Sequence, residues 1–464
     1  MATIRVFKQS IRMPFIVLAA LEGISFCLSF LFAVYVRFDD VGAGLEGLAL
    51  QQYLFGLIMS LSMLSVGLYH ARLREGLSGV MLRAIVGVVL SSIALALLFY
   101  IFPELFVGRG VLAIAALLSL LAVMVIRLIS MRVVDQRLLK RRILVLGAGD
   151  RADNIVNRLR RRSDQRGFSI VGFVHIKGEH NVVPEELIVD TGDNFVEYVL
   201  SNEIDEIVVA VGDRRKKFPL DELLDCKLSG VEVVDIITFF EREIGKIELD
   251  LLHPSWLIFS TGFDRGLLRE YLERGFDVFA SSLLLVVTWP VMLAAIAAIR
   301  IEDGRGASFL YKQKRVGEFG DVFDVLKFRS MIENAEVKGS PQWATDNDSR
   351  ITRVGRFIRK TRIDELPQIL NVLRGDMSFV GPRPERPEFV ELLNEKIPYY
   401  NERHRVKPGI TGWAQLCYPY GASDNDSLQK LQYDLYYVKN HNLLLDLIIL
   451  IQTVEVVLFG KGAR

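Results

Sequence analysis

The stretch 361–368 reads Thr361-Arg362-Ile363-Asp364-Glu365-Leu366-Pro367-Gln368. It predicts the start of a short helix, because Pro367 is tolerated in a first helical turn, apolar residues then recur at helical spacing, and Gly375 supplies a stop. Asp364 and Glu365 would lie near the positive end of the helix dipole, which favours ionised carboxylates. Asp364 could equally be a simple N-cap, because Asp is among the preferred capping residues.

Basic residues surround this acidic pair in the sequence. A predicted strand over 323–331 projects Lys327 and Arg329 from one face. A rigid turn with Pro382 and Arg383 follows the acids. Cations gathered around a paired acid suit a diphosphate substrate with a divalent metal. Some of the basic residues would form only a solvated surface.

Four sequence blocks occur in order in the C-terminal part of the chain. They read KFRSM at 327–331, IDELPQ at 363–368, GDMSFVGPRP at 375–384 and KPGITGWAQ at 407–415. Together they resemble the bacterial sugar transferases of the polyprenyl-phosphate hexose-1-phosphate transferase family. The resemblance covers roughly Arg265 to the C-terminus. The architecture before it resembles the long family members that initiate exopolysaccharide or O-antigen synthesis.

The resemblance implies a ping-pong reaction. Asp364 would attack the sugar-bearing phosphate of a UDP-sugar and expel UMP, and polyprenyl (undecaprenyl) phosphate would then take the phosphosugar from the aspartate. It also implies that Glu365 assists and that Mg²⁺ binds Asp364, which suits an ion that takes one or two carboxylates. The substrate-binding residues would be Lys327, Arg329, Arg359, Pro382 and Arg383. The six histidines are scattered, so no zinc-type cluster is indicated.

Composition agrees with a lipid substrate. The 464 residues are 51% hydrophobic with a net charge of +1, and the mean hydropathy is +0.30. These values favour a membrane protein with soluble parts and argue against a nucleic-acid binder. The three cysteines form no spacing motif, so neither a disulfide framework nor a metal site is indicated.

Four long apolar stretches open the chain, near 13–36, 53–69, 85–102 and 111–129. Each is close to the length that crosses a hydrocarbon core of about 30 Å. Basic residues flank the bundle at both ends and lie between its second and third stretches, so both ends are expected in the cytoplasm of a bacterium, with the bundle in the inner membrane. Glu22 lies inside the first stretch, and no intramembrane cation partner is apparent. A helix-pairing contact or a partly hydrated position is therefore expected.

A fifth apolar segment, 276–299, has basic residues on both sides. The positive-inside rule would keep both flanks on one side of the membrane, and Pro290 offers a break for a helix that enters and turns back. The family resemblance also implies a re-entrant helix, although this chain has Trp289 where relatives usually carry Ser. The alternative is an ordinary fifth span.

The region 141–264 predicts a soluble Rossmann-like α/β domain. A buried-strand pattern at 142–146 runs into a Gly-x-Gly-x-x-Ala turn and a helix. The second strand, 168–174, lacks the acidic residue that dinucleotide-binding domains place at its end. We therefore expect regulation or oligomerisation, with nucleotide binding as an open alternative, and Gly147 and Gly149 could serve only tight packing.

The predicted fold is an α/β membrane protein in three parts: a four-helix transmembrane region over 1–140, the Rossmann-like domain over 141–264, and a mainly helical catalytic domain over 265–464. The segment 443–459 predicts an amphipathic helix on the leaflet or against the catalytic domain. A homo-oligomer, such as a dimer, and polysaccharide-assembly partners are expected, and nucleic acid is not. Two rival classes are a membrane-bound nucleotide-sugar-modifying enzyme and a non-catalytic scaffold of polysaccharide assembly. The first should carry a Tyr-x-x-x-Lys pair, and no tyrosine in this chain has a lysine four residues later.

Overall fold

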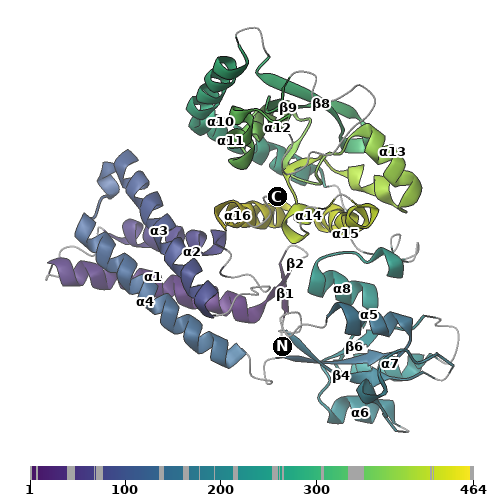
Figure 1. Ribbon diagram of the computed structural model, residues 1–464. Coiled ribbons are helices and arrows are strands. Elements are labelled where there is room, and N and C mark those ends of the chain that lie inside the picture. Colours follow the sequence, from purple (N-terminus) through teal and green to yellow (C-terminus); the bar gives the residue numbers. More distant parts are fainter. Residues whose placement is uncertain are drawn as a thin grey trace. The chain divides into compact units, whose positions relative to one another are not determined.

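The computed structural model describes residues 3–6, 9–38, 48–66, 68, 77–134, 140–159, 167–176, 178–192, 194–212, 218–252, 256, 260, 262–263, 266–304, 308–332, 350–418, 421 and 423–459. The chain divides into two compact units, Met1–Ile244 and Gly245–Arg464. Figure 1 traces the elements of both.

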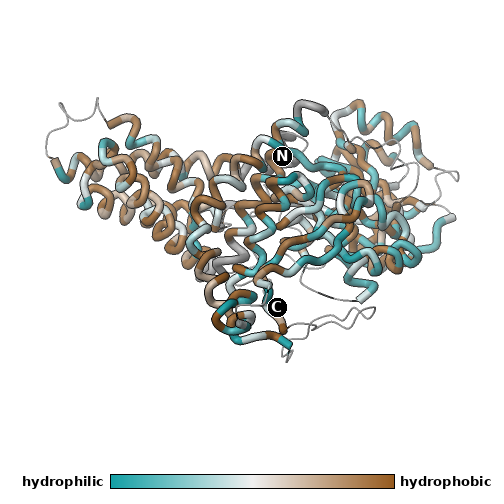
Figure 2. Tube along the Cα trace, turned by 90° about the horizontal axis from the view of Figure 1, so that it is seen from above, coloured by the Kyte–Doolittle hydropathy of each residue, from teal (hydrophilic) through white to brown (hydrophobic). Residues whose placement is uncertain are grey.

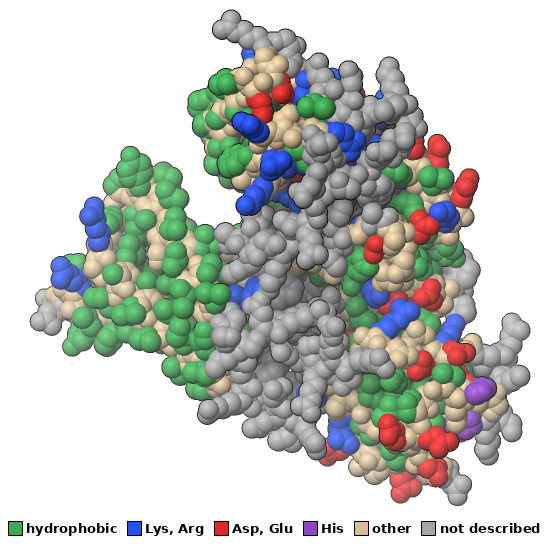
Figure 3. All heavy atoms as spheres, in the orientation of Figure 1, with side chains coloured by type: hydrophobic (Ala, Val, Ile, Leu, Met, Phe, Trp, Pro, Cys, Tyr) green, Lys and Arg blue, Asp and Glu red, His purple; other side chains and the backbone are tan. Residues whose placement is uncertain are grey.

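Four apolar helices form the bundle of the first unit, as predicted. They are α1 (Met13–Phe38), α2 (Ala49–Ser65), α3 (Leu77–Ile101) and α4 (Arg109–Val134), with a short hairpin of β1 (Thr3–Val6) and β2 (Gln9–Arg12) before them and the 3-10 turn η1 (Pro103–Leu105) before α4. Three of these helices are long and apolar enough to cross a membrane, and α2 is shorter. Figures 2 and 3 show hydrophobic residues along these helices and over their visible face. An apolar exterior of this kind suits lipid.

Glu22 of α1 is fully buried and forms an ion pair with Arg127 of α4. Nε and Nη2 of Arg127 lie 2.6 and 3.1 Å from the two carboxylate oxygens, and Nη1 donates to the Leu68 carbonyl at 2.8 Å. The predicted helix-pairing contact is confirmed, but the view that Glu22 lacks a cation partner was wrong. The partner lies 105 residues away in the sequence, and only the packing of α1 against α4 brings the two charges together, as a buried charge requires.

A five-stranded parallel sheet follows the bundle in the chain, in the order β5-β4-β3-β6-β7. This is the order in which doubly wound α/β sheets are built. The central strands β3 and β6 are almost entirely buried, which is typical of parallel sheets. The elements are β3 (Arg141–Leu146), α5 (Asp150–Arg158), β4 (Phe168–Val174), η3 (Glu185–Leu187), β5 (Ile188–Val189), α6 (Phe195–Ser201), β6 (Glu206–Val209), α7 (Leu220–Leu228), β7 (Glu232–Asp235) and α8 (Ile236–Ile244).

The second unit is mainly helical, as predicted, with two small two-stranded sheets. The β8–β9 hairpin is antiparallel and β10 pairs with β11 in parallel. Its elements are η4 (Leu249–Leu251), α10 (Leu267–Asp303), β8 (Leu310–Val316), η5 (Glu318–Gly320), β9 (Val322–Phe328), α11 (Arg353–Lys360), η6 (Ile363–Glu365), α12 (Gln368–Arg374), β10 (Ser378–Val380), α13 (Pro387–Lys396), η7 (Tyr400–Arg405), β11 (Gly409–Thr411), α14 (Trp413–Cys417), α15 (Asp424–Asn440) and α16 (Leu443–Phe459).

Helix α10 contains the fifth apolar segment. It runs for 37 residues as one helical element with Pro290 inside it, and by length and composition it could cross a membrane. The proposed entry and return of this helix therefore stays a prediction at this point.

Helix α16 packs on the rest of the second unit. Leu445 and Ile449 are buried in one cluster with Val380, and buried Asp446 accepts a hydrogen bond from the Tyr437 hydroxyl at 2.7 Å. Of the two predicted placements of this segment, packing against the domain is the one seen. A placement on the leaflet stays a prediction.

Candidate active site

Asp364 and Glu365 lie on the 3-10 turn η6, between helices α11 and α12. Helix α12 ends as the sequence predicts, with Gly375 in the left-handed conformation (φ 95°) after it, but it begins only at Gln368, so Pro367 lies just before the helix and not in its first turn. Pro367 holds the N-cap position, and no side chain caps this helix. The interpretation of Asp364 as an N-cap was therefore wrong. Its Oδ1 atom is buried and accepts no hydrogen bond from any residue that the structure describes.

Three cations converge on one oxygen of Glu365. Its Oε1 atom lies 3.1 Å from Nζ of Lys327, 3.2 Å from Nη2 of Arg383 and 4.0 Å from Nη1 of Arg362. Lys327 comes from strand β9, Arg383 from the Pro-Arg turn after β10, and Arg362 from the entrance to η6. One carboxylate thus fixes three positively charged groups beside Asp364.

The two adjacent acids have opposite electrostatic environments. Burial raises the pKa of Asp364 to about 6, and the negative charge of Glu365 adds to this increase. Burial would also raise the pKa of Glu365, but Arg383, Lys327 and Arg362 outweigh it and hold that pKa well below its ordinary value. Asp364 is still largely ionised at neutral pH, but the predicted effect of the helix dipole does not account for this, because α12 starts only at Gln368 and burial raises the Asp364 pKa.

The other predicted residues lie around this pair at different depths. Arg359, on the last turn of α11, opposes the rise in the Asp364 pKa through its charge. Pro382 is buried, and its carbonyl accepts a hydrogen bond from the Gly409 amide at 3.0 Å. Arg329 follows the end of β9, where its amide donates to the Phe309 carbonyl at 3.0 Å.

The Pro-Arg turn is held by close contact between β10 and β11. The Gly381 amide donates to the Thr411 carbonyl at 2.9 Å. A Cβ atom at Gly409 would collide with the backbone of Gly381, so only glycine allows the two strands to come this close. The third and fourth sequence blocks therefore meet in space and aim Arg383 at Glu365.

A buried network supports Arg383 from behind, and nothing in the sequence pattern indicated it. Arg403 of η7 donates from Nη2 to the Arg383 carbonyl at 3.0 Å and pairs with Asp434 of α15 at 2.8 Å. Its Nη1 donates to the Tyr400 hydroxyl at 2.7 Å. Arg403, Tyr400 and Asp434 are all buried, so this network holds the backbone that carries Arg383.

Asn371 joins the strand of Lys327 to the helix that follows Glu365. Its Oδ1 atom accepts from the Leu326 amide at 3.0 Å, and its Nδ2 donates to the Asp324 carbonyl at 2.8 Å. The side chain is fully buried. A polar amide within the apolar stripe of a predicted helix is the signal that could have identified it.

Helix α10 contacts the elements around η6 at both of its ends. Near its start, Arg274 donates to the Val372 and Leu373 carbonyls at the end of α12, both at 2.6 Å. Near its end, the Glu302 carboxylate accepts from the Arg353 and Val354 amides at the start of α11, at 2.8 and 2.9 Å. Both ends of this apolar helix are therefore fastened to one domain.

The side chains around Asp364 show whether the site suits a divalent metal ion. Among the described residues, no group of three or more His, Cys, Asp or Glu is placed to hold a metal ion. Mg²⁺ needs only one or two carboxylates, because water and substrate phosphate complete its shell. The unpartnered, buried Oδ1 of Asp364 is a donor of this type, so the residues fit Mg²⁺ and do not form a closed protein cage.

The family profile of the bacterial sugar transferases matches residues 268–460. An undecaprenyl-phosphate galactose phosphotransferase of Salmonella typhimurium is 32% identical over 348 residues, which are 70% of this chain and 69% of that protein. The chain belongs to the bacterial sugar transferase family.

Two further relatives of this chain align with it over a smaller share of their own length. A UDP-N-acetylgalactosamine-undecaprenyl-phosphate N-acetylgalactosaminephosphotransferase of Aeromonas hydrophila is 42% identical over 242 residues, 52% of this chain and 56% of that protein. An undecaprenyl-phosphate glucose phosphotransferase of Komagataeibacter xylinus is 33% identical over 338 residues, 70% of this chain and 61% of that protein. The chain thus spans less than two thirds of these two proteins.

A second profile, of a CoA-binding domain, matches residues 65–217. The glycine turn in this region does not fit a diphosphate, because Glu179 fills it. The Ala148 amide donates to Glu179 Oε2 at 3.2 Å, and a Cβ atom at Gly149 would lie 2.8 Å from Oε1. A Cβ atom at Gly147 would lie 2.9 Å from the Ala210 carbonyl. The alternative that these glycines serve tight packing is therefore the better account. The end of β4 lacks the acidic residue of dinucleotide-binding domains, and Glu179 lies five residues after that strand.

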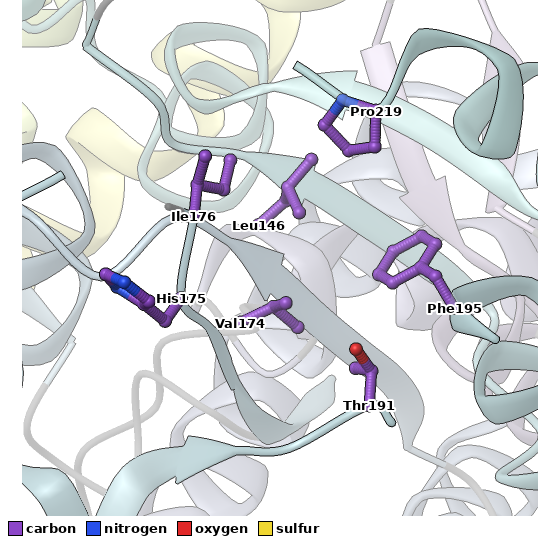
Figure 4. A pocket seen from close by; sticks show the side chains of 7 residues that line it. All are labelled: Leu146, Val174, His175, Ile176, Thr191, Phe195 and Pro219. Carbon is purple, nitrogen blue, oxygen red and sulfur yellow. The ribbon is translucent and has the colours of Figure 1, made fainter. Parts of the chain in front are cut away.

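A pocket of about 190 Å³ lies in the α/β domain (Figure 4). Leu146 and Val174, at the carboxyl ends of β3 and β4, form part of its wall with Phe195 of α6. The full lining is Leu146, Val174, His175, Ile176, Thr191, Phe195 and Pro219. Because this lining contains no Lys or Arg, it suits an uncharged group and offers no counter-charge for phosphate.

Proposed function

We propose that this chain transfers a hexose-1-phosphate from a UDP-sugar to polyprenyl (undecaprenyl) phosphate and releases UMP. The observation that carries the proposal is the buried, unpartnered oxygen of Asp364 beside a glutamate that holds three cations. The activities of the relatives from Salmonella and Komagataeibacter support the same substrate class. The reaction would initiate synthesis of an exopolysaccharide or O-antigen.

The reaction takes two displacements at one phosphorus atom. A carboxylate oxygen of Asp364 attacks the sugar-linked phosphate, the bond from that phosphorus to the bridging oxygen of UMP breaks, and UMP leaves with the electron pair. An oxygen of polyprenyl phosphate then attacks the same phosphorus, and the bond to the aspartate breaks. Covalent catalysis replaces one difficult displacement with two easier ones.

The pKa values support different roles for the two acids. Asp364, with a pKa of about 6, is largely ionised at neutral pH and more basic than an ordinary aspartate, which favours it as the nucleophile. Glu365 is committed to its cations, whose charges can stabilise the phosphate oxygens in the transition state. Lys327 and Arg383 are thus placed to hold phosphate groups next to Asp364, with Arg359 contributing charge.

We propose Mg²⁺ as the metal, held by Asp364 with Glu365 assisting. When bound, the ion would neutralise phosphate charge and act as a Lewis acid. The protein contributes the open carboxylate oxygen and the surrounding cations, and both follow from the burial of η6 against β9.

The contacts of α10 support a re-entrant arrangement at the cytoplasmic face of the bacterial inner membrane. Arg274 and Glu302, 28 residues apart, are both bound to the elements that flank η6. If the helix crossed the bilayer, one domain carrying the cationic helix α11 would have to reach both sides of an apolar core of about 30 Å. A bend at Pro290 lets both ends stay on the side where UDP-sugars are made.

The proposal is tested by covalent labelling with a UDP-sugar that carries ³²P in its sugar-linked phosphate. The purified full chain in detergent should become labelled, and Asp364→Asn should abolish the label because the amide cannot attack. Asp321→Asn, on an exposed turn of the β8–β9 hairpin, is the matched control and should label normally. Persistent labelling of Asp364→Asn would remove Asp364 as the nucleophile.

A further inference from the structure

The membrane helix α10 holds the turn of the nucleophile from both sides. Helix α11 precedes η6 and helix α12 follows it, so the two helices flank Asp364 in the chain. Glu302, near the end of α10, binds the free amides at the start of α11. Arg274, near the start of α10, donates to the Val372 and Leu373 carbonyls at the end of α12.

Each contact is a charge-matched helix cap. The first amides of a helix and its last carbonyls have no partners within the helix, and they form the positive and negative ends of its dipole. Thr352 caps only the Gly355 amide of α11, at 2.9 Å, and Glu302 supplies the acceptors for the two amides before it. The guanidinium of Arg274 caps two carbonyls of α12 at once.

Apolar packing fills the space between these caps. Ala295 and Ile299 of α10 are buried in one cluster with Ile358 of α11, and Ile363 and Leu366 on either side of the acidic pair pack against it. Helix α10 therefore packs against α11 and η6 through the part of it that precedes Glu302. Figure 1 shows α10, α11 and α12 next to one another.

We propose that Arg274 and Glu302 are positioning residues that set the height of Asp364 relative to the lipid headgroups. This proposal rests on the proposed function. Because α10 is anchored in the bilayer by its apolar surface, whatever fixes α11 and α12 to it also fixes the depth of the turn between them. If α11 and α12 shifted along α10 by one helical turn, η6 would be displaced by about 5.4 Å. This displacement exceeds the distance of about 3–3.5 Å at which a nucleophile meets its target.

The two displacements depend on this height to different extents. The UDP-sugar arrives from water and can reach Asp364 at any height. The phosphate of the polyprenyl acceptor is held at the headgroup level by its chain. Loss of a cap should therefore slow the acceptor step and spare the donor step.

The test uses the full chain in vesicles of phosphatidylethanolamine and phosphatidylglycerol, with Mg²⁺ present. Glu302→Ala should keep its rate of covalent labelling by the UDP-sugar within about twofold of wild type, and it should lose tenfold or more in transfer to undecaprenyl phosphate. A water-soluble, short-chain polyprenyl phosphate should restore most of that loss. Glu302→Gln, which keeps an acceptor oxygen, should lie between the two, and Arg274→Met should behave like Glu302→Ala.

Glu270→Gln makes the same charge change on an exposed position of the same helix and should alter neither step. Equal losses in both steps, a loss that the short acceptor does not relieve, or unchanged transfer would each overturn the proposed positioning role. Failure of the proposed function itself would look different, because the wild-type protein would then take up no label at all.

Discussion

Asp434→Asn tests the buried network behind the Pro-Arg turn. Asp434 is 2% exposed and its partner Arg403 is 6% exposed. The substitution keeps the shape of the side chain but leaves the Arg403 cation buried without a counter-charge, which typically costs about 3–5 kcal/mol. We expect about 3 kcal/mol, at the lower end of that range, because the new amide oxygen can still accept a hydrogen bond from Arg403.

The assay is thermal melting of the full chain in detergent, followed by tryptophan fluorescence. Burial raises the pKa of Asp434 to about 6, so the measurement belongs at pH 8, where this carboxylate is ionised. For a unit of about 200 residues, each kcal/mol moves the melting temperature by about 2–4 °C, so the transition of the catalytic unit should fall by about 6–12 °C.

The matched control is Asp424→Asn, which breaks the exposed ion pair with Lys396. Its atoms lie 2.7 Å apart, but the two side chains are 63% and 56% exposed. Such pairs contribute about 0–1 kcal/mol, so the shift should stay below about 4 °C. If Asp434→Asn shifts the transition no more than Asp424→Asn does, the reasoning about the buried pair is refuted.

The same network should affect the donor step through Arg383. Arg403 reaches Arg383 by its backbone carbonyl, so Asp434→Asn should lower the rate of covalent labelling only while the Arg383 side chain is present. Arg383→Ala alone should weaken use of the UDP-sugar, because a phosphate-binding fork is lost. The double variant should be little worse than Arg383→Ala, and strictly additive losses would show that Asp434 acts elsewhere.

Two further predictions concern other carboxylates. Burial raises the pKa of Asp446 to about 8, so the folded chain keeps a proton that the unfolded chain releases near pH 4. The free energy of unfolding of wild type, relative to that of Asp446→Asn, should therefore be highest at low pH. It should fall by at most about 1.4 kcal/mol per pH unit up to pH 8 and then level off. Melting curves measured across this pH range would show this, and a difference that does not change with pH would contradict it. The groups that face this carboxyl are Tyr437, Glu273, Arg269 and Asp277. In the α/β domain, Glu179→Ala should create calorimetrically measurable ADP binding that wild type and the exposed-site control Glu185→Ala lack, and ADP binding by wild type would contradict the sealed turn.

Local elements could be predicted because their signals lie within a few residues of one another. The leucine spacing after Pro367, with Gly375 as a stop, predicts α12. The strand-turn-helix pattern at Gly147 predicts the start of the parallel sheet, and the long apolar stretches predict the helices of the bundle. These patterns depend on periodicity and caps, which do not require knowledge of distant neighbours.

The contacts that set charge could not be predicted in this way. Arg127 meets Glu22 across 105 residues, and Glu179 reaches the glycine turn from a segment outside any strand. The pKa of Asp364 depends on how deeply η6 is buried. Burial and pairing arise from tertiary packing, so a sequence pattern can name the charged residues without showing which of them meet.

The clearest case is the acidic pair itself. Asp364 and Glu365 are neighbours on one turn, yet the turn directs their carboxylates into different surroundings: one meets three cations, and one oxygen of the other meets no described hydrogen-bond donor. Their pKa values are therefore driven in opposite directions. When environment separates two like groups in this way, one can serve as a fixed anchor while the other stays free to react. Exchanging the two residue types would put the longer side chain at the reactive position, and the shorter carboxylate at position 365 would then lie farther from the cations that Glu365 gathers.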